Sequence, residues 1–135
     1  MCQDVVYHFD TNILVLLLRG KDLALAVRIA ALGRRQRCVS AVVRAELLLG
    51  IEKSDRRAQR AEQLEQFLCE FETVDFDSSC AAHYASIRGH LERNGCRIGD
   101  NDTMIAATAR AYGAVLITRN EGEFKRVPGL TVEPW

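Results

Sequence analysis

Three carboxylates occupy positions in this sequence where an acidic side chain is costly. Glu46 falls within a predicted helix, and its neighbours three and four residues away are valine, leucine and glycine. Asp102 lies on the apolar side of a second predicted helix, among isoleucine, alanine and glycine, and Asp10 ends an apolar strand. A carboxylate that is buried without a partner is strongly disfavoured. The three acids therefore call for an explanation.

Each acid has an ordinary structural explanation. Asp10 could cap a helix, Asp102 could stabilise the first turn of its helix through the helix dipole, and Glu46 could pair with a buried arginine. A hard divalent cation accounts for all three at once, because Mg²⁺ and Mn²⁺ prefer oxygen ligands. Metals held by acids are a common arrangement for phosphodiester cleavage. The residues thus favour a metal-dependent hydrolytic site.

The elements that must position these acids follow from the hydrophobic pattern. Short apolar and β-branched runs predict strands at 5–9, 38–39, 73–74, 114–118 and 130–132. Helical spacing of apolar residues predicts helices at 13–18, 22–31, 40–50, 58–71, 80–91 and 99–111. Strands that alternate with helices indicate an α/β fold with a small, mainly parallel sheet.

In such a sheet, functional residues gather beyond the carboxyl ends of the strands. Asp10 follows the first predicted strand, and Ser40 follows the second and can cap the helix that carries Glu46. Thr118 and Asn120 lie at the end of the predicted strand 114–118. The rule selects these positions independently of any motif.

Length and composition restrict the class of protein. The chain has 135 residues, of which 48% are hydrophobic and 27% charged, so we expect a single globular domain spanning 1–135. Its longest apolar run, 13–18, is too short to cross a membrane, and the first residues lack a signal-peptide pattern. We therefore expect a cytoplasmic protein. A formal net charge of +0 argues against a protein that coats nucleic acid, but it allows a local basic rim.

Several other kinds of site are disfavoured by the sequence. The 5 cysteines include no C-x-x-C pair, so a zinc site is not indicated. No phosphate-binding G-x-x-x-x-G-K-[ST] loop and no legible Ser/His/Asp arrangement occur. Arg56, Arg57 and Arg60 are consistent with a solvated helix face, although contact with RNA is an alternative.

Five segments, in order, carry a resemblance to a known family. They are FDTNI at 9–13, Ser40 followed by Glu46-Leu47 and Gly50, IGDNDTMIAATA at 98–109, VLITRNEGEF at 115–124 and RVPGLTVEPW at 126–135. With these segments the chain resembles PIN-domain ribonucleases, and specifically the VapC toxins of bacterial toxin–antitoxin pairs. The segments span nearly the whole chain, and the one at 98–109 is the most diagnostic.

The resemblance implies a fold, an activity and partners. The fold is a PIN-like three-layer sandwich, and the activity is a Mg²⁺- or Mn²⁺-dependent endoribonuclease that cleaves structured RNA, such as tRNA, by metal-activated water. The partners are a VapB-type antitoxin and a second copy of the chain in a homodimer. Asp10, Glu46 and Asp102 match the family's metal-binding acids, and Asn120 matches its fourth catalytic position.

Asn120 departs from the family's four-acid pattern, because asparagine keeps a carbonyl ligand but loses a charge. This departure leaves open a second metal, and it supports an alternative: a catalytically weak PIN-fold module that acts by binding RNA or antitoxin. A phosphorylation receiver domain is a more distant alternative, since it needs paired acids after the first strand, where Asp10 stands alone.

Two acids near the start of the helix 99–111 are expected to differ in role. Residues 100 and 102 are about 200° apart around a helix. Asp102 shares its face with Ile105 and Ala109, which predicts that it points inward as a metal ligand. Asp100 shares its face with Thr103, Met104 and Ala107, and we expect it at the N-cap position.

Overall fold

The computed structural model describes residues 4–135 and contains a sheet of five short strands. The strands are β1 (Tyr7–Phe9), β2 (Arg37–Ser40), β3 (Glu72–Val74), β4 (Val115–Ile117) and β5 (Thr131–Glu133). They lie in the order β3-β2-β1-β4-β5, and all four strand pairings are parallel. The strand that ends in Asp10 therefore lies at the centre of the sheet.

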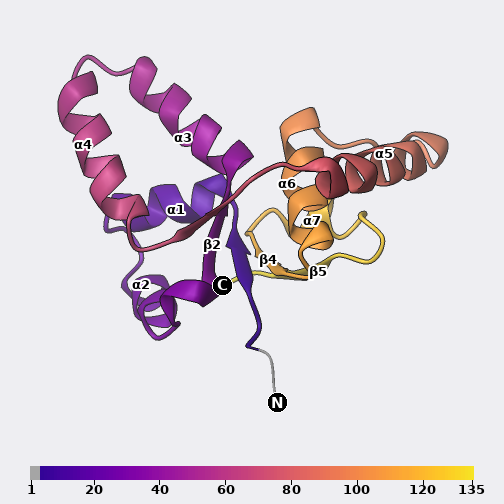
Figure 1. Cartoon of the computed structure of the whole chain (residues 1–135), viewed down its shortest axis with the longest axis horizontal. Coiled ribbons are helices and arrows are strands. Elements are labelled where there is room, and N and C mark those ends of the chain that lie inside the picture. Colours follow the sequence, from indigo (N-terminus) through magenta and orange to yellow (C-terminus); the bar gives the residue numbers. More distant parts are fainter. Residues whose placement is uncertain (1–3) are drawn as a thin grey trace.

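Helices cover both faces of this sheet. They are α1 (Thr11–Leu18), α2 (Leu23–Ala30), α3 (Ala41–Glu52), α4 (Arg57–Leu68), α5 (Ser78–Arg93), α6 (Asp100–Ala111) and the short α7 (Glu121–Phe124). A 3₁₀ turn, Arg34–Gln36, precedes β2. In Figure 1, α1 to α4 lie on one side of the strands and α5 to α7 lie on the other. The expected three-layer α/β sandwich is confirmed.

Polar side chains begin the helices that leave the strands. The carboxylates of Asp22 and Asp77 accept hydrogen bonds from backbone N–H groups in the first turns of α2 and α5, at 3.0 Å each. The hydroxyl of Ser40 does the same for Val43 at the start of α3, at 3.2 Å. These caps satisfy N–H groups that have no partner within the helix. They also set where each helix departs from the sheet.

The expected elements agree with the structure except at their ends, at one cap and at two short elements that were not expected, the 3₁₀ turn Arg34–Gln36 and α7. All five strands occur, and the sheet is entirely parallel. Gly99, and not Asp100, occupies the N-cap position of α6, so that expectation was wrong. The carboxylate of Asp100 instead accepts hydrogen bonds from Arg97 and Arg88, at 2.8 and 3.0 Å. These two guanidinium groups hold the Asp100 carboxylate away from the free backbone N–H groups in the first turn of α6.

The core consists of side chains from the strands and from the facing helices. Phe9, Leu116 and Ile117 from the central strands are at most 1% exposed, and Ile105 and Leu91 cover them from α6 and α5. Trp135, at the chain end, packs on Tyr7 and Phe9, with ring centroids 4.8 and 5.9 Å apart. The last residues therefore close one side of the core.

Further features agree with the composition. Of the cysteines at 4–135, Cys38 and Cys80 are buried, Cys96 is half-buried and Cys69 is exposed, and all four are free thiols; Cys2 lies outside the described residues. Within the described part of the chain, no helix combines the length and apolar character that a membrane span requires.

Burial predicts opposite outcomes for two leucine substitutions. Leu91→Ala should lower the free energy of unfolding by about 2–5 kcal/mol, because it removes packed atoms from a fully buried site. Leu23→Ala should change it by less than about 0.5 kcal/mol, because Leu23 is 78% exposed on α2. Urea denaturation followed by circular dichroism measures both. Similar losses for the two variants would contradict this description of the core.

Candidate active site

Asp10 is the most constrained acid at the carboxyl edge of the sheet. It ends β1 and caps α1, and it is 7% exposed. One carboxylate oxygen accepts a hydrogen bond from the backbone N–H of Thr11 and the other from the hydroxyl of Thr118, at 2.8 Å each. Both oxygens are therefore held in place. The capping explanation from the sequence is correct, and it coexists with a position in the site.

Glu46 approaches Asp10 from α3. Because Ser40 caps α3 at the end of β2, Glu46 lies in the second turn of the helix, directly above the sheet edge. Its Oε1 accepts a hydrogen bond of 2.6 Å from the hydroxyl of Thr11, the residue that follows Asp10. Thr11 thus contacts both acids, through its N–H and its hydroxyl. Glu46 forms no ion pair with an arginine of residues 4–135, so the ordinary explanation for it fails.

Asp102 enters from the other side of the sheet, in the first turn of α6. It is half-buried, and its Oδ2 lies close to Gly99, where an added Cβ atom would be 3.7 Å from it. The charges of Asp10, Glu123 and Glu46 all act on it. The three acids that the sequence predicts as metal ligands therefore lie near enough for their charges to act on one another.

Glu123 is a fourth acid that sequence reasoning missed. It lies in α7, and the charge of its carboxylate acts on both Asp10 and Asp102. The residue falls inside the segment 115–124, which was matched to the family, but the pattern gave no sign of a helix there. That one-turn helix, four residues long, is too short to show an apolar stripe. Thr11 and Thr118 were also not recognised as partners of the acids.

Asn120 has a more peripheral place than the sequence predicted. It is exposed, its N–H donates to the hydroxyl of Thr118 at 3.0 Å, and its side-chain amide donates to Oε2 of Glu123 at 3.0 Å. It touches the site through these two residues and not through Asp10 or Asp102. A carboxylate thus stands beside Asn120 and supplies negative charge that the asparagine lacks.

Burial, together with nearby negative charge, raises the pKa of two acids at the site. Burial is the main cause that raises the pKa of Asp10, while its hydrogen bonds with Thr118 and Thr11 oppose the increase. Burial also raises the pKa of Asp102 to about 6, and the charges of Asp10, Glu123 and Glu46 add to the effect. Nearby negative charge makes it harder for these two carboxyl groups to lose a proton. The edge of the sheet therefore favours a bound positive charge.

The chemistry of these donors fits a hard divalent cation. Four carboxylates share the site, and among residues 4–135 no lysine, arginine or histidine forms an ion pair with any of them. Within residues 4–135, no group of three or more Asp, Glu, His or Cys side chains lies close enough together to hold a metal ion without further ligands. Mg²⁺ is usually held by one or two carboxylates together with water and substrate phosphates, so an open group of acids suits it.

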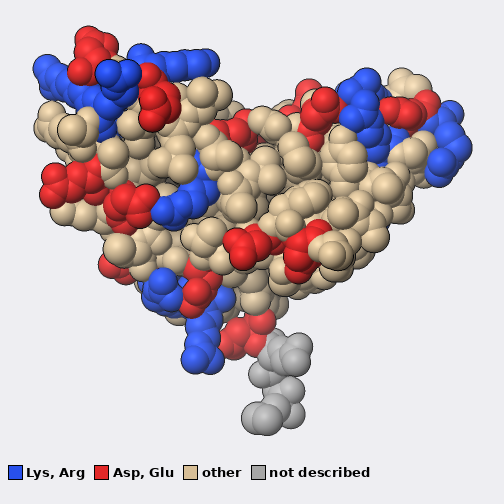
Figure 2. Space-filling view, turned by 45° about the horizontal axis from the view of Figure 1, so that its top comes forward, with Lys and Arg blue, Asp and Glu red and all other residues tan. Residues whose placement is uncertain are grey.

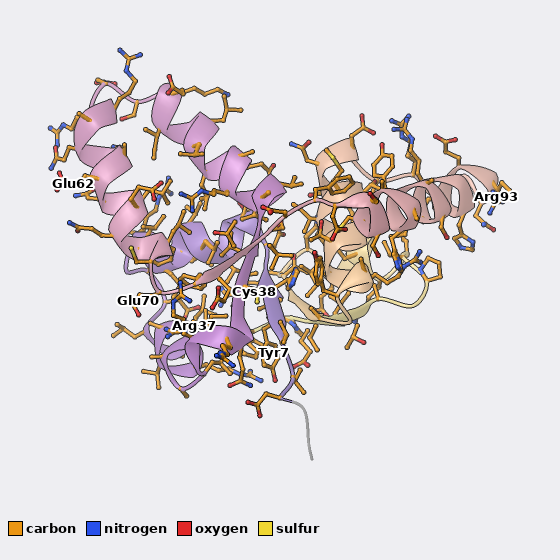
Figure 3. All side chains as sticks on the ribbon, viewed as in Figure 1. Tyr7, Arg37, Cys38, Glu62, Glu70 and Arg93 are labelled. Atoms are coloured by element: carbon orange, nitrogen blue, oxygen red, sulfur yellow. The ribbon has the colours of Figure 1, made fainter. Side chains whose placement is uncertain are left out.

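The surface carries charge of both signs. Figure 2 shows lysine and arginine side chains at both upper corners of one face, near its middle and at its lower edge, with acidic side chains among them. In Figure 3, Tyr7, Arg37 and Cys38 mark the end of the sheet where β1 and β2 begin. The four acids belong to the other end, where the strands stop.

The sequence matches a protein family described as PIN domain over residues 7–130. The chain is 36% identical over 132 residues to Ribonuclease VapC2 of Rickettsia felis, and the match covers 97% of this chain and 98% of the relative. It is 35% identical over 129 residues to a tRNA(fMet)-specific endonuclease VapC of Shigella flexneri, with coverage of 96% and 97%. These are similarities over nearly the whole chain.

Solved structures show the same fold. A crystal structure of VapBC2 from Rickettsia felis, bound to a DNA fragment from their promoter, contains a chain that superposes with a TM-score of 0.91 and 36% identity, over 97% of this chain and 99% of that chain. A DNA-bound VapBC from Salmonella typhimurium gives a TM-score of 0.90 and 32% identity, with coverage of 96% and 98%.

Removing the charge of Asp102 and removing the charge of Asp100 should change the free energy of unfolding in opposite directions. In the metal-free protein, Asp102→Asn should stabilise the fold at neutral pH, because it removes a charge that burial and other acids disfavour. Asp100→Asn should destabilise it, because Arg97 and Arg88 hold the pKa of Asp100 below its usual range. Urea denaturation in EDTA measures both. A destabilised Asp102→Asn protein would contradict the described charge balance.

The contribution of Asp102 to the free energy of unfolding depends on pH. Since its folded-state pKa of about 6 lies above the ordinary pKa of 3.8 for an aspartate, the folded protein holds this proton more tightly than the unfolded chain does. Stability from this group is therefore present below pH 3.8 and is lost as pH rises through about 6. The advantage of Asp102→Asn should grow across that window and then stay constant. Mg²⁺ should raise the melting temperature of the wild type more than that of the variant.

Proposed function

The chain belongs to the PIN-domain family, and from this membership we propose that it is a VapC-type endoribonuclease that uses a divalent metal ion held by Asp10, Glu46, Asp102 and Glu123. Its relatives are VapC ribonucleases, and its structural neighbours are VapBC toxin–antitoxin complexes. The observation that supports the metal site best is the half-buried carboxylate of Asp102, whose pKa burial raises to about 6, with a further contribution from the charges of Asp10, Glu123 and Glu46.

Different residues of the chain have different roles at the site. When bound, a Mg²⁺ or Mn²⁺ ion supplies a positive charge that neutralises the acids and polarises a phosphate oxygen of the substrate. Thr11 and Thr118 fix both oxygens of Asp10, so this ligand loses no side-chain entropy on binding. Asn120 steadies Glu123 through its amide group and places it beside Asp102.

We propose structured RNA, and tRNA first among it, as the substrate. Two of the similar proteins, from Shigella flexneri and Salmonella typhimurium, are called tRNA(fMet)-specific endonucleases, which makes initiator tRNA the first substrate to test. In-line attack by water would leave a 3′-hydroxyl and a 5′-phosphate, as the family resemblance implies. A tRNA substrate is cytoplasmic, and we place the activity there.

The partner that fits this assignment is a VapB-type antitoxin. The similar solved structures from Rickettsia felis and Salmonella typhimurium are VapBC complexes, both with DNA. We infer that this chain pairs with its own antitoxin in the same way and that it is inhibited by it.

A homodimer is the second assembly that we propose. A shallow hollow of about 330 Å³ lies between α3 and α6, and apart from Glu46 and Asn101 its lining is apolar. Leu49, in this lining, is 54% exposed, and the neighbouring Leu48 is 40% exposed. An apolar face of this kind suits a second copy, and because Glu46 borders it, the partner would lie close to the acids.

The alternative of a catalytically weak binding module rests on Asn120 alone. In the structure, Glu123 lies beside Asn120 and contributes the carboxylate that Asn120 lacks. This placement favours the enzyme over the binding module.

Loss of one acid should abolish most of the cleavage without unfolding the protein. Glu46→Gln keeps the size of the side chain but removes a charged ligand, so Mn²⁺-dependent cleavage of an initiator tRNA transcript should fall by at least about 10–100-fold, the loss typical of residues that only orient metal ligands. Glu123→Gln and Asp102→Asn should behave alike. EDTA should stop the wild-type reaction, and circular dichroism checks the fold.

Asp100→Asn provides the matched control for this assay. Its side chain pairs with Arg97 and Arg88 and is 57% exposed, so cleavage should stay close to the wild-type rate. If Asp100→Asn were inactive and Asp102→Asn active, the assignment of the site would be reversed. Full activity of Glu46→Gln would remove Glu46 from it.

The dimer can be tested by charge at its proposed face. Leu49→Glu should convert the dimer to a monomer in sedimentation velocity at micromolar concentration, because the new carboxylate would be buried against an apolar partner. Leu23→Glu introduces the same charge on α2, which does not line this hollow, and it should leave the dimer intact. A wild-type protein that sediments only as a monomer would refute the proposal.

A further inference from the structure

A groove beside Glu46 contains two arginines whose charges are not neutralised within the protein. The groove has a volume of about 280 Å³ and lies between α1, α3 and α4. Arg19 and Arg60 line it together with Thr11 and Glu46, which belong to the site of the acids. Neither guanidinium group forms an ion pair within residues 4–135. The groove is therefore continuous with the acids and is positively charged.

Nearby acids on α4 do not offset this charge. Arg60, Gln63 and Leu64 share the side of α4 that lines the groove. Glu62 lies on the outer side of the helix, where Figure 3 shows it far from the sheet. Glu65 is paired with Arg44 of α3 at 2.6 Å. The two free arginines are thus available to an outside ligand.

Gly50 leaves open space in the wall of the groove at α3. It lies inside the helix and in the lining of the groove, and its backbone has no positive φ angle. A Cβ atom at this position would meet nothing within 4 Å. A glycine inside a helix lowers its stability relative to alanine, so neither the backbone nor the packing accounts for it. The space that it leaves is open to a ligand in the groove.

We propose that this groove binds the RNA strand next to the cleaved bond, with Arg19 and Arg60 each contacting a backbone phosphate and Gly50 providing room for the strand. This inference rests on the proposed function, since it takes the substrate to be RNA. A strand that places one phosphate at the acids must leave the site, and the groove begins at Glu46. Planar guanidinium groups bind phosphate through paired hydrogen bonds.

The lining also indicates how RNA would be read there. Its apolar part is aliphatic, formed by Val15, Leu18, Leu47, Ile51 and Leu64, and it holds no aromatic ring on which a base could stack. Contacts with phosphates position a nucleic acid without reading its sequence. The groove therefore holds the backbone and contributes affinity, while sequence selection lies elsewhere.

The expected effect of removing either arginine is on binding and not on chemistry. Arg19→Ala and Arg60→Ala should each raise KM for a fluorescein-labelled initiator tRNA transcript by roughly tenfold, the loss of one charge-assisted contact, with kcat unchanged. Each should reduce the slope of log affinity against log salt concentration by about 0.7. Gly50→Leu should raise KM in the same way by filling the groove.

Binding is also measured separately from cleavage. Fluorescence anisotropy of the same labelled tRNA, in Mg²⁺ and over a series of KCl concentrations, is recorded with Asp102→Asn as the parent protein, so that the RNA stays intact. The arginine and Gly50 substitutions are then added to it. Arg60→Lys keeps the charge and should keep the salt slope, which separates phosphate contact from a change in fold.

Arg35→Ala is the control for loss of one positive charge. Arg35 is exposed, forms no ion pair among the described residues and precedes β2, at the opposite end of the sheet. Its removal should alter neither KM nor the salt slope by as much as either groove arginine does.

The outcomes separate this inference from the proposed function. If the wild type cleaves tRNA but Arg19→Ala and Arg60→Ala match it in KM and salt slope, the RNA groove is refuted. If these variants change only the binding of a purified antitoxin, the groove holds a protein segment and the inference is again refuted. A wild type that cleaves no RNA overturns the proposed function, while the anisotropy series still decides whether the groove binds RNA.

Discussion

The repulsion between carboxylates at one edge of the sheet is the constraint on which the rest of the structure depends. Asp10 is buried at the end of the central strand, and it is tolerated there because Thr11 and Thr118 each donate a hydrogen bond to it. Around it, Glu46, Asp102 and Glu123 increase the negative charge. Such a cluster weakens the metal-free fold and favours a cation. The proposed affinity for a divalent ion and the expected loss of stability without it would therefore have the same origin.

The order of the strands makes this cluster possible. Because β1 lies between β2 and β4, the segments that leave all three strands start at neighbouring points of one edge. α3 leaves β2 and carries Glu46, the loop after β4 carries Thr118 and leads to α7, and α6 approaches from the opposite layer. A core of fully buried aliphatic and aromatic side chains holds these layers together. The stability gained there offsets what the acids cost.

Elsewhere in the molecule, several arginines are paired with carboxylates that lie outside the site. Arg88 and Arg97 are held on Asp100 at the start of α6, and Arg119 is paired with Asp22 at the start of α2. These ion pairs are partly exposed, so each contributes little to stability. The ion pairs hold these three guanidinium groups on Asp100 and Asp22, so none of them neutralises the acids of the site. A chain with a formal net charge of +0 thus keeps a local excess of negative charge at one edge and free arginines beside it.

The sequence by itself determined the strands, the helices other than α7, the fold class and three of the four acids. Periodicity reports which face of an element is buried, and Asp10, Glu46 and Asp102 stood out because each interrupts an apolar face. Only the tertiary structure revealed Glu123, since the single turn of α7 is too short to carry a periodic signal. It also decided that Gly99 caps α6, because the arginines that attract Asp100 come from α5 and from the loop that follows it. Contacts between residues distant in sequence, such as Thr118 with Asp10, leave no local pattern and arise only when the sheet has formed.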